Sequence, residues 1–290
     1  MLIEKDDPVL CESYTYSGSL STLNPLECKL VGVDTDAHGL IPSALQKRLA
    51  DLKHSPRKPK VLYTIPTGSN PTGGSMSLER KREVYRLAQE HNLIILEDDP
   101  YYYLQFGPRS QSLLSMDTDG RVLRFDSFSK IISSGLRLGW ATGPAPLIER
   151  LNLHMQATSL HPSGISQVVL LAILENLKHD GFLTHTGSVS AFYKKRMEAF
   201  QAAAQKHLTG LAEWNTPSAG MFCWIKLLGI EDSFSLIQEK AVKEKVLLVP
   251  GSSFAADGQK SPFVRASFST ATPQQMDEAL RRLATLLKEK

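Results

Sequence analysis

Short, continuous apolar runs alternate with helical periodicity in the first half of the chain, and this alternation limits the folds open to it. Residues 8–11 and 93–96 are such runs, residues 60–65 are a further strand candidate, and each of the three is followed by polar or turn-forming residues. Between residues 65 and 93, Ser77 is suited to cap a helix whose apolar residues share one face. Apolar strands separated by amphipathic helices are typical of a parallel sheet covered on both faces. The sequence therefore predicts an α/β fold.

The loops that follow three of the expected strands carry polar side chains. Asn70 lies in the segment 66–74, where two prolines and three glycines favour turns. Asp98 follows the apolar run 93–96, and Lys130 follows a further expected strand at 121–125. Ligands of such sheets bind beyond the carboxyl ends of the strands. We therefore expect these three side chains to meet at one site.

The middle of the chain leads away from this sheet. Leu138 to Thr142 is expected to form another strand, and residues 146–177 show a helical pattern that is interrupted at 161–164. A further helix, from about Ser188 to Leu208, is expected to cross into a second domain.

The C-terminal third mixes short strands with helices. Residues 221–227, 246–249 and 263–268 are expected strands, and a helix is expected near 233–243. Thr272 begins a last helix with one apolar stripe that continues to the end of the chain. The pattern predicts a large, mostly parallel-sheet domain over residues 1–185 and a smaller α+β domain over residues 186–290.

Composition and charge exclude several classes of protein. The chain has 290 residues, 42% of them hydrophobic and 22% charged, which is typical of a globular protein. A net charge of +3 without basic runs argues against nucleic acid binding, and no apolar run is long enough to span a bilayer. The three cysteines and eight histidines lack metal-like spacing, so we expect no metal site. Residues 1–7 do not resemble a targeting segment.

Lys130 lies in a segment suited to hold a phosphorylated aldehyde cofactor. A desolvated lysine near other cations can become a nucleophilic free amine. Ser127 and Ser129 offer hydroxyl donors, and Arg137 offers a guanidinium fork that can bind a phosphate dianion. We interpret Lys130 as the lysine that binds pyridoxal 5'-phosphate as a Schiff base. Alone, the Ser-x-Ser-Lys pattern is weak, since most lysines are exposed.

Other residues complete a site for this cofactor. Asp98 is suited to pair with the protonated pyridine nitrogen, which keeps the ring an electron sink. Tyr101 and Asn70 are expected to bind the ring's phenolate oxygen, with Tyr102 as the rival of Tyr101. Asn70 also belongs to the expected substrate-binding set.

Two more residues are expected to bind the ring and the substrate. Tyr16 is expected to stack on the ring, with Tyr14 as its rival. Arg265 is expected to bind the substrate's α-carboxylate through its guanidinium fork. Each site residue has an alternative interpretation as a turn or surface residue.

The ordered set of motifs resembles the class I/II, fold-type I pyridoxal-phosphate-dependent aminotransferases. It comprises Asn70-Pro71-x-Gly73, Asp98-x-Pro100-Tyr101, Ser127-x-Ser129-Lys130, Arg137 and Arg265. A narrower resemblance rests on Tyr63-Thr64-Ile65-Pro66, on the segments 97–102 and 126–137, and on Leu211-Ala212-Glu213-Trp214. On these residues the chain most resembles the kynurenine/α-aminoadipate aminotransferase group, from about Val9 to the C-terminus. The resemblance implies the large-plus-small-domain fold and transfer of an amino group from α-aminoadipate or kynurenine to 2-oxoglutarate.

The resemblance carries further expectations. It implies a homodimer and a mitochondrial or cytosolic location, with amino acids and 2-oxo acids as partners. The family's chains begin well before residue 1 of this one, so we expect the N-terminal part of the large domain to be missing. Two alternatives stay open: an inactive truncated fragment or isoform, and another pyridoxal-phosphate reaction such as β-elimination from a cysteine conjugate.

Overall fold

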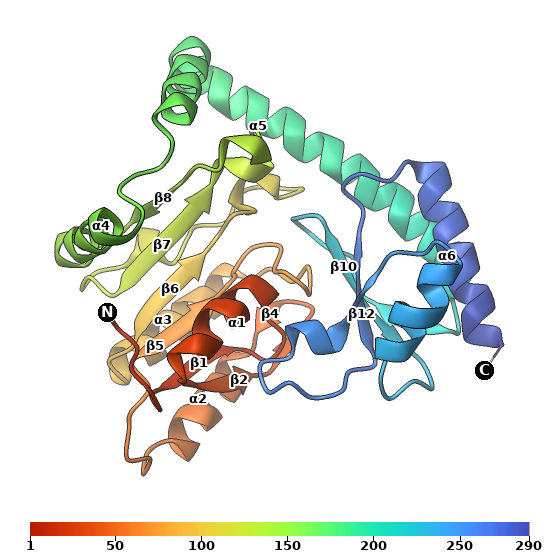
Figure 1. The fold of residues 1–290 in the computed structure, drawn as a ribbon, viewed down its shortest axis with the longest axis horizontal. Helices are drawn as coiled ribbons and strands as arrows, with labels where there is room; N and C mark the ends of the chain where they lie inside the picture. Colours follow the sequence, from red (N-terminus) through yellow and green to blue (C-terminus); the bar gives the residue numbers. More distant parts are fainter. Residues whose placement is uncertain (290) are drawn as a thin grey trace.

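A six-stranded sheet forms the N-terminal half of the computed structural model, which describes residues 1–289 (Figure 1). Its strand order is β2-β1-β5-β6-β7-β8. The bounds are Pro8–Glu12 for β1, Lys29–Val33 for β2, Val61–Thr64 for β5, Ile94–Asp98 for β6, Val122–Ser127 for β7 and Gly139–Thr142 for β8. Neighbouring strands are parallel except for β8, which is antiparallel to β7. The predicted mostly parallel sheet is therefore confirmed.

Helices cover both faces of this sheet because neighbouring residues of a strand point to opposite sides. On one face, Leu10 and Leu62 are buried in a cluster with residues of α2 (Pro42–Asp51) and α3 (Leu78–Glu90). On the other face, Val9 and Val61 pack with Leu23 at the end of α1 (Ser17–Leu23).

Local signals fix where the predicted helix α3 begins. Ser77 caps it as expected, since its hydroxyl accepts a hydrogen bond from the backbone N–H of Arg80. A short hairpin of β3 (Thr35–Asp36) and β4 (Gly39–Leu40) precedes α2.

A second, antiparallel sheet follows in the C-terminal third. Its order is β11-β12-β10-β9, with β9 at Ala212–Trp214, β10 at Phe222–Leu227, β11 at Val249–Pro250 and β12 at Phe263–Ser267. Helix α6 (Pro273–Lys288) packs on it through the predicted apolar stripe of Met276, Leu280, Leu283 and Leu287, all buried. Thr272 and Gln275 form a reciprocal capping box at its start.

One long helix connects the two sheets. After α4 (Ala145–Thr158), α5 runs from Gly164 to Leu208 and ends beside α6 (Figure 1). Its backbone leaves helical geometry at Lys178, and the second helical segment follows directly. The expectation of a separate helix starting near Ser188 was therefore wrong, because the helical segment resumes about one residue after the break. Helix α5 crosses the expected domain boundary at residue 185, so that boundary stays a prediction.

Other expected boundaries also shift. The strand expected over 246–249 is only the two-residue β11, and the helix expected near 233–243 contains a π-helical segment, Leu236–Ala241. Strands β2 and β9 and helices α1 and α2 were not predicted. Short 3₁₀ turns occur at Asn24–Leu26, Tyr102–Leu104, Leu114–Met116, Phe128–Lys130, Ser134–Leu136 and Gly251–Phe254. No helix within residues 1–289 is long and apolar enough to cross a membrane.

The two sheets meet where the loop after β5 touches the segment before β10. Gly220 has a φ of +78°, and a Cβ atom at this position would lie 2.8 Å from the carbonyl oxygen of Gly68. The backbone N–H of Gly220 donates to the carbonyl of Leu104 at 3.1 Å. Only glycine combines this backbone conformation with so close an approach. This contact sets the separation of the two sheets at the edge that carries Asn70.

We expect Gly220→Ala to destabilise the fold more than the matched change Gly210→Ala. Gly210 has nearly the same φ, +79°, but nothing lies within 4 Å of its added Cβ. Both variants lose about 1–2 kcal/mol to left-handed backbone strain. Only Gly220→Ala also displaces the Gly68 backbone, which costs about a further 1–3 kcal/mol. Urea unfolding measures both changes, and equal losses of free energy of unfolding would contradict the proposed close contact.

Candidate active site

A cavity of about 380 Å³ lies at the carboxyl edge of the large sheet, where the second sheet approaches it. Its volume is within the range of about 300–1,000 Å³ that is usual for small-molecule sites. Six of the residues selected from the sequence line it together: Tyr16, Asn70, Asp98, Tyr101, Lys130 and Arg265. Apolar walls come from Ile65, Pro100, Met221 and Phe222. The cavity therefore combines residues of both sheets and of the loops between their strands.

Asp98 enters this cavity because of its position in the alternation of β6. Its neighbours Glu97 and Asp99 point to the opposite face of the sheet, where the Arg124 guanidinium binds them at 3.3 Å and 2.8 Å. Arg124 also binds Asp126 at 2.7 Å. Glu97 and Asp99 are therefore paired in a buried ion network, whereas Asp98 lines the cavity.

The Asp98 carboxylate is held by one hydroxyl. The Tyr63 hydroxyl donates to Asp98 Oδ2 at 2.6 Å. Burial raises the pKa of Asp98, while the Tyr63 hydrogen bond and the positive charge of Lys130 lower it. Asp98 therefore needs its donors to remain an anion in this setting.

Lys130 is half-buried at the end of a 3₁₀ turn that follows β7. Burial lowers the pKa of its amine, and the charge of Arg137 lowers it further, while Asp98 acts in the opposite direction. A lowered pKa increases the fraction of neutral amine, which is the form that attacks carbonyl carbons. Within residues 1–289, Lys130 makes no ion pair.

Arg265 reaches the cavity from β12. Its Nη1 donates to Asn70 Oδ1 at 2.8 Å, and its guanidinium carbon lies 4.3 Å and 4.9 Å from the ring centres of Phe222 and Phe254. Burial lowers its pKa, and its buried Nε has no hydrogen-bond partner within residues 1–289. Neither the Asn70 oxygen nor the rings neutralise the guanidinium charge. The arrangement suits a small anion.

Tyr16 lines the cavity, whereas its rival Tyr14 does not. An added Cβ at Gly18 would lie 2.5 Å from the Tyr16 ring, so the glycine makes room for the ring in its observed place. Tyr14 instead packs against Trp224 and Phe263, with ring centres 5.1 Å and 5.5 Å away.

The adjacent tyrosines of the 101–103 run also separate. Tyr101 lines the cavity and is buried edge-on against Phe222, at 5.9 Å between ring centres. Tyr102, the rival of Tyr101, lies on the Arg124 guanidinium.

Ser127, Ser129 and Arg137 lie beside Lys130 but do not line this cavity. The backbone N–H of Ser129 donates to Ser127 Oγ at 3.1 Å, which caps the turn that carries Lys130. Arg137 Nη1 lies 3.5 Å from Ser129 Oγ and donates to the carbonyl of Ser134 at 3.1 Å. The three residues form a polar group next to the lysine, and their hydroxyl and guanidinium donors remain accessible.

Two residues that support the cavity were not identified from the sequence. Tyr63 holds Asp98, and Glu12, fully buried at the end of β1, accepts hydrogen bonds from Thr64 Oγ1 (2.7 Å), Ile65 N (3.1 Å) and Ser69 Oγ (2.8 Å). Glu12 thereby fixes the loop that leads to Asn70. The sequence did offer one signal for Glu12, because it is an acidic residue at the end of an apolar strand. A carboxylate buried in that position requires hydrogen-bond donors around it.

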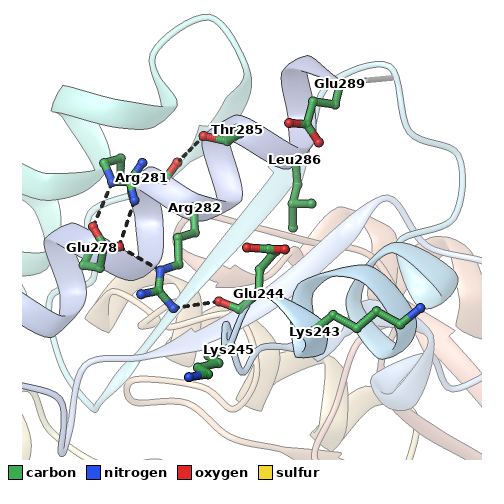
Figure 2. Close-up of a pocket in the computed structure, with 9 residues that line it drawn as sticks. All are labelled: Lys243, Glu244, Lys245, Glu278, Arg281, Arg282, Thr285, Leu286 and Glu289. Carbon is green, nitrogen blue, oxygen red and sulfur yellow. Dashed lines mark hydrogen bonds and ion pairs between the residues drawn. The ribbon is translucent and has the colours of Figure 1, made fainter.

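A second cavity, of about 410 Å³, lies on the surface of the second sheet's helices and differs in its electrostatics (Figure 2). Glu278 binds both Arg281 and Arg282, and Arg282 also donates to the carbonyl of Glu244 at 2.8 Å. Most of its charged side chains are exposed to solvent, where water screens their interactions. The cavity at the sheet edge, where Arg265 has a buried donor without a partner within residues 1–289, is the better candidate for an anionic ligand.

The chain is similar along its whole length to a known mammalian protein. The kynurenine/alpha-aminoadipate aminotransferase, mitochondrial, of Rattus norvegicus is 50% identical over 297 residues, which cover all of this chain and 70% of the rat protein.

Two solved structures share the fold. A Pyrococcus horikoshii kynurenine aminotransferase, in complex with PMP, KYN as substrates and KYA as products, matches with a TM-score of 0.94 at 32% identity, over 99% of this chain and 70% of its own. LysN, an alpha-aminoadipate aminotransferase from Thermus thermophilus complexed with N-(5'-phosphopyridoxyl)-L-leucine, matches with a TM-score of 0.92 at 28% identity, over 99% and 72%. A family model described as aminotransferase class I and II matches residues 1–283, and the chain belongs to this family.

Proposed function

We propose that the chain binds pyridoxal 5'-phosphate at Lys130 and transfers the amino group of an α-aminoadipate- or kynurenine-type amino acid to 2-oxoglutarate. The observation that carries the proposal is the convergence of Asp98, Lys130 and Arg265 on one cavity. The names of the rat, Pyrococcus and Thermus relatives support the substrate class.

The residues present fit this cofactor. Lys130 offers an amine with a lowered pKa, and Asp98 offers a carboxylate in the same cavity as Tyr101 and Asn70. We propose that Ser127, Ser129 and Arg137 bind the phosphate, because their donors lie together beside Lys130. Arg265 Nε, a buried donor without a partner within residues 1–289, is consistent with a carboxylate-bearing substrate.

The proposed reaction divides the chemistry among four residues. When bound, pyridoxal phosphate supplies an electron sink that stabilises negative charge at the substrate's α-carbon. Asp98 holds the proton on the ring nitrogen, and the Lys130 amine takes the proton from the α-carbon as general base. Arg265 binds the α-carboxylate, and Asn70 holds the guanidinium in place at 2.8 Å. Orienting the substrate in this way aligns the bond to be broken.

We further propose that the chain acts as a homodimer with two domains, 1–185 and 186–290. Exposed apolar side chains in the first part of α5, among them Ile165, Val168 and Leu171, form a surface of the kind that protein interfaces use. A mitochondrial or cytosolic location stays a proposal that rests on the relatives.

We expect borohydride reduction in the presence of pyridoxal phosphate to label Lys130. Mass spectrometry of the digested protein should find the phosphopyridoxyl group on the peptide that contains this residue. Lys130→Ala should abolish the label and lower kcat by at least about 10²–10⁴-fold, because the general base is lost. Lys47→Ala, which changes an exposed lysine of α2, should leave both unchanged. A label on another lysine would contradict the proposal.

The reaction type is tested by the requirement for an amino acceptor. With kynurenine or α-aminoadipate as donor, product should form only when 2-oxoglutarate is added, and glutamate should accumulate in equal amount. Product from a cysteine conjugate without 2-oxoglutarate would instead indicate β-elimination, and no product from any donor would contradict enzymatic function of this chain.

We expect Arg265→Lys to raise KM for the amino acid about 10- to 100-fold. Lysine keeps the positive charge but loses the bidentate fork and the hydrogen bond to Asn70, an interaction worth about 1.5–3 kcal/mol. Steady-state kinetics measures the change. Arg281→Lys, in an exposed ion pair with Glu278, is the matched control and should leave KM unchanged. A KM that Arg265→Lys leaves unaltered would rule out Arg265 as the carboxylate-binding residue.

A further inference from the structure

Tyr63 connects the helix that follows Tyr16 to the Asp98 carboxylate. The Tyr63 side chain is buried on β5, and its hydroxyl lies 2.7 Å from Ser19 Oγ and 2.6 Å from Asp98 Oδ2. Ser19 belongs to α1, Tyr63 to β5 and Asp98 to β6. The two hydrogen bonds therefore link α1, β5 and β6 in one continuous series.

The direction of these hydrogen bonds is fixed by chemistry. A carboxylate only accepts, so the Tyr63 hydroxyl donates to Asp98, and the Ser19 hydroxyl donates to Tyr63. Burial and the neighbouring Asp98 raise the pKa of Tyr63, which keeps it a phenol that can donate. A hydroxyl that itself accepts a hydrogen bond is a stronger donor, so Ser19 strengthens the bond to Asp98.

We propose that Tyr63, supported by Ser19, is a positioning residue for Asp98: it occupies Oδ2 and leaves Oδ1 directed to the ligand in the cavity. Within residues 1–289, Asp98 Oδ1 makes no hydrogen bond. This inference rests on the proposed function, in which Asp98 pairs with the ring nitrogen of the cofactor. It adds a residue that does not line the cavity itself and acts on the ligand through Asp98.

The charges around Asp98 show why this donor matters. Nearby acidic groups disfavour its ionised form, and the positive charge of Lys130 favours it. The acidic groups are Glu12, Asp99 and Asp126, and the cavity also contains the titratable groups of Tyr101 and Arg265. Burial is the largest influence and raises the pKa of Asp98. Loss of the Tyr63 donor therefore raises it further.

Titration of Asp98 by carboxyl ¹³C NMR, without cofactor, is the first test. Tyr63→Phe keeps the ring but removes the donor, and the Asp98 midpoint should rise by about one pH unit. Ser19→Ala should move it in the same direction by a smaller amount. An Asp98 midpoint unchanged in both variants would overturn the inference, and Ser19→Ala alone decides it if Tyr63→Phe does not fold.

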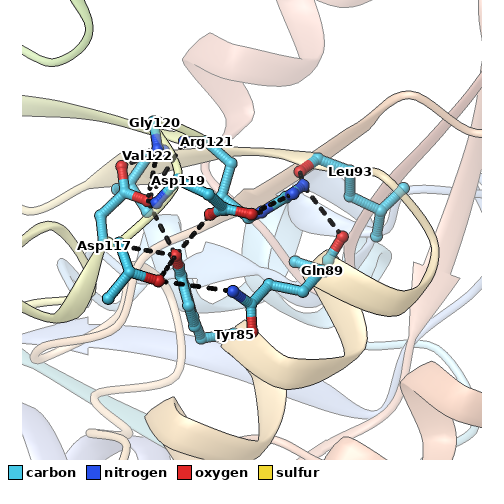
Figure 3. Close-up of polar contacts among 10 residues, drawn as sticks. Tyr85, Gln89, Leu93, Asp117, Asp119, Gly120, Arg121 and Val122 are labelled. Atoms are coloured by element: carbon cyan, nitrogen blue, oxygen red, sulfur yellow. Dashed lines mark hydrogen bonds and ion pairs between the residues drawn. The ribbon is translucent and has the colours of Figure 1, made fainter.

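Tyr85→Phe is the matched control. Tyr85 is as buried as Tyr63, and its hydroxyl also lies against carboxylates, 2.9 Å from Asp117 Oδ1 and 2.6 Å from Asp119 Oδ1 (Figure 3). This cluster lies before β7, at the edge of the sheet opposite the cavity. Tyr85→Phe should leave the Asp98 midpoint unchanged, and an equal rise in this variant would show that the effect is not specific to Tyr63.

Binding of pyridoxal phosphate, followed by fluorescence at a series of pH values, is the second test. Affinity should fall as the pH drops through the Asp98 midpoint, because a neutral Asp98 cannot pair with a protonated ring nitrogen. In Tyr63→Phe this fall should begin about one pH unit higher, and in Tyr85→Phe it should not move.

The two tests separate the inference from the proposed function. A wild-type chain that binds no pyridoxal phosphate at any pH would contradict the proposed function and with it the role of Tyr63 toward the cofactor. Normal binding with the same pH dependence in wild type and Tyr63→Phe would overturn the inference alone.

Discussion

The contact between two sheets at one edge is the constraint on which the candidate site depends. Asn70 and Arg265 are separated by 195 residues in sequence, and their hydrogen bond closes the cavity from opposite sides. The backbone approach of Gly68 to Gly220 sets the distance at which this bond can form. Neither sheet alone carries enough of the lining residues to bind a ligand. The site is therefore a product of tertiary structure rather than of any single motif.

Much of the large sheet could be predicted from sequence because its strands are largely buried. Strands buried on both faces are largely apolar, so β1, β5 and β6 are visible as runs of such residues, while Arg124 and Asp126 interrupt that pattern in β7. Strand β2 at the sheet edge is only partly buried and lacks that signal. The break in helix α5 falls at a lysine, Lys178, rather than at a proline or glycine. The sequence on either side is helical, so nothing in it marks the break. The C-terminal part of α5 packs against α6, a long-range contact that periodicity does not reveal.

The acidic run Glu97-Asp98-Asp99 shows how far the site could be predicted. Alternation along a strand places its middle residue on the opposite face from the other two, but sequence does not say which face holds the site. The motif resemblance selected Asp98, and the structure places Asp98 in the cavity. The partner of the other two acids, Arg124, lies on another strand and carries no recognisable signal. Tyr63 was missed for the same reason, because its contact with Asp98 joins two strands.

Unbalanced charge distinguishes this cavity from the exposed ion pairs elsewhere. Burying a guanidinium or a carboxylate without full compensation destabilises a fold, so proteins retain such groups where a ligand completes them. Arg265 has a hydrogen bond and two aromatic rings but no carboxylate within residues 1–289, and Asp98 has one hydroxyl but no cation in direct contact there. An amino acid bound to a cationic ring system would supply an anion to the first and a positive charge to the second. The two uncompensated charges destabilise the fold when no ligand is bound. A ligand that carries both complementary charges relieves this cost, and the relief adds to its binding energy.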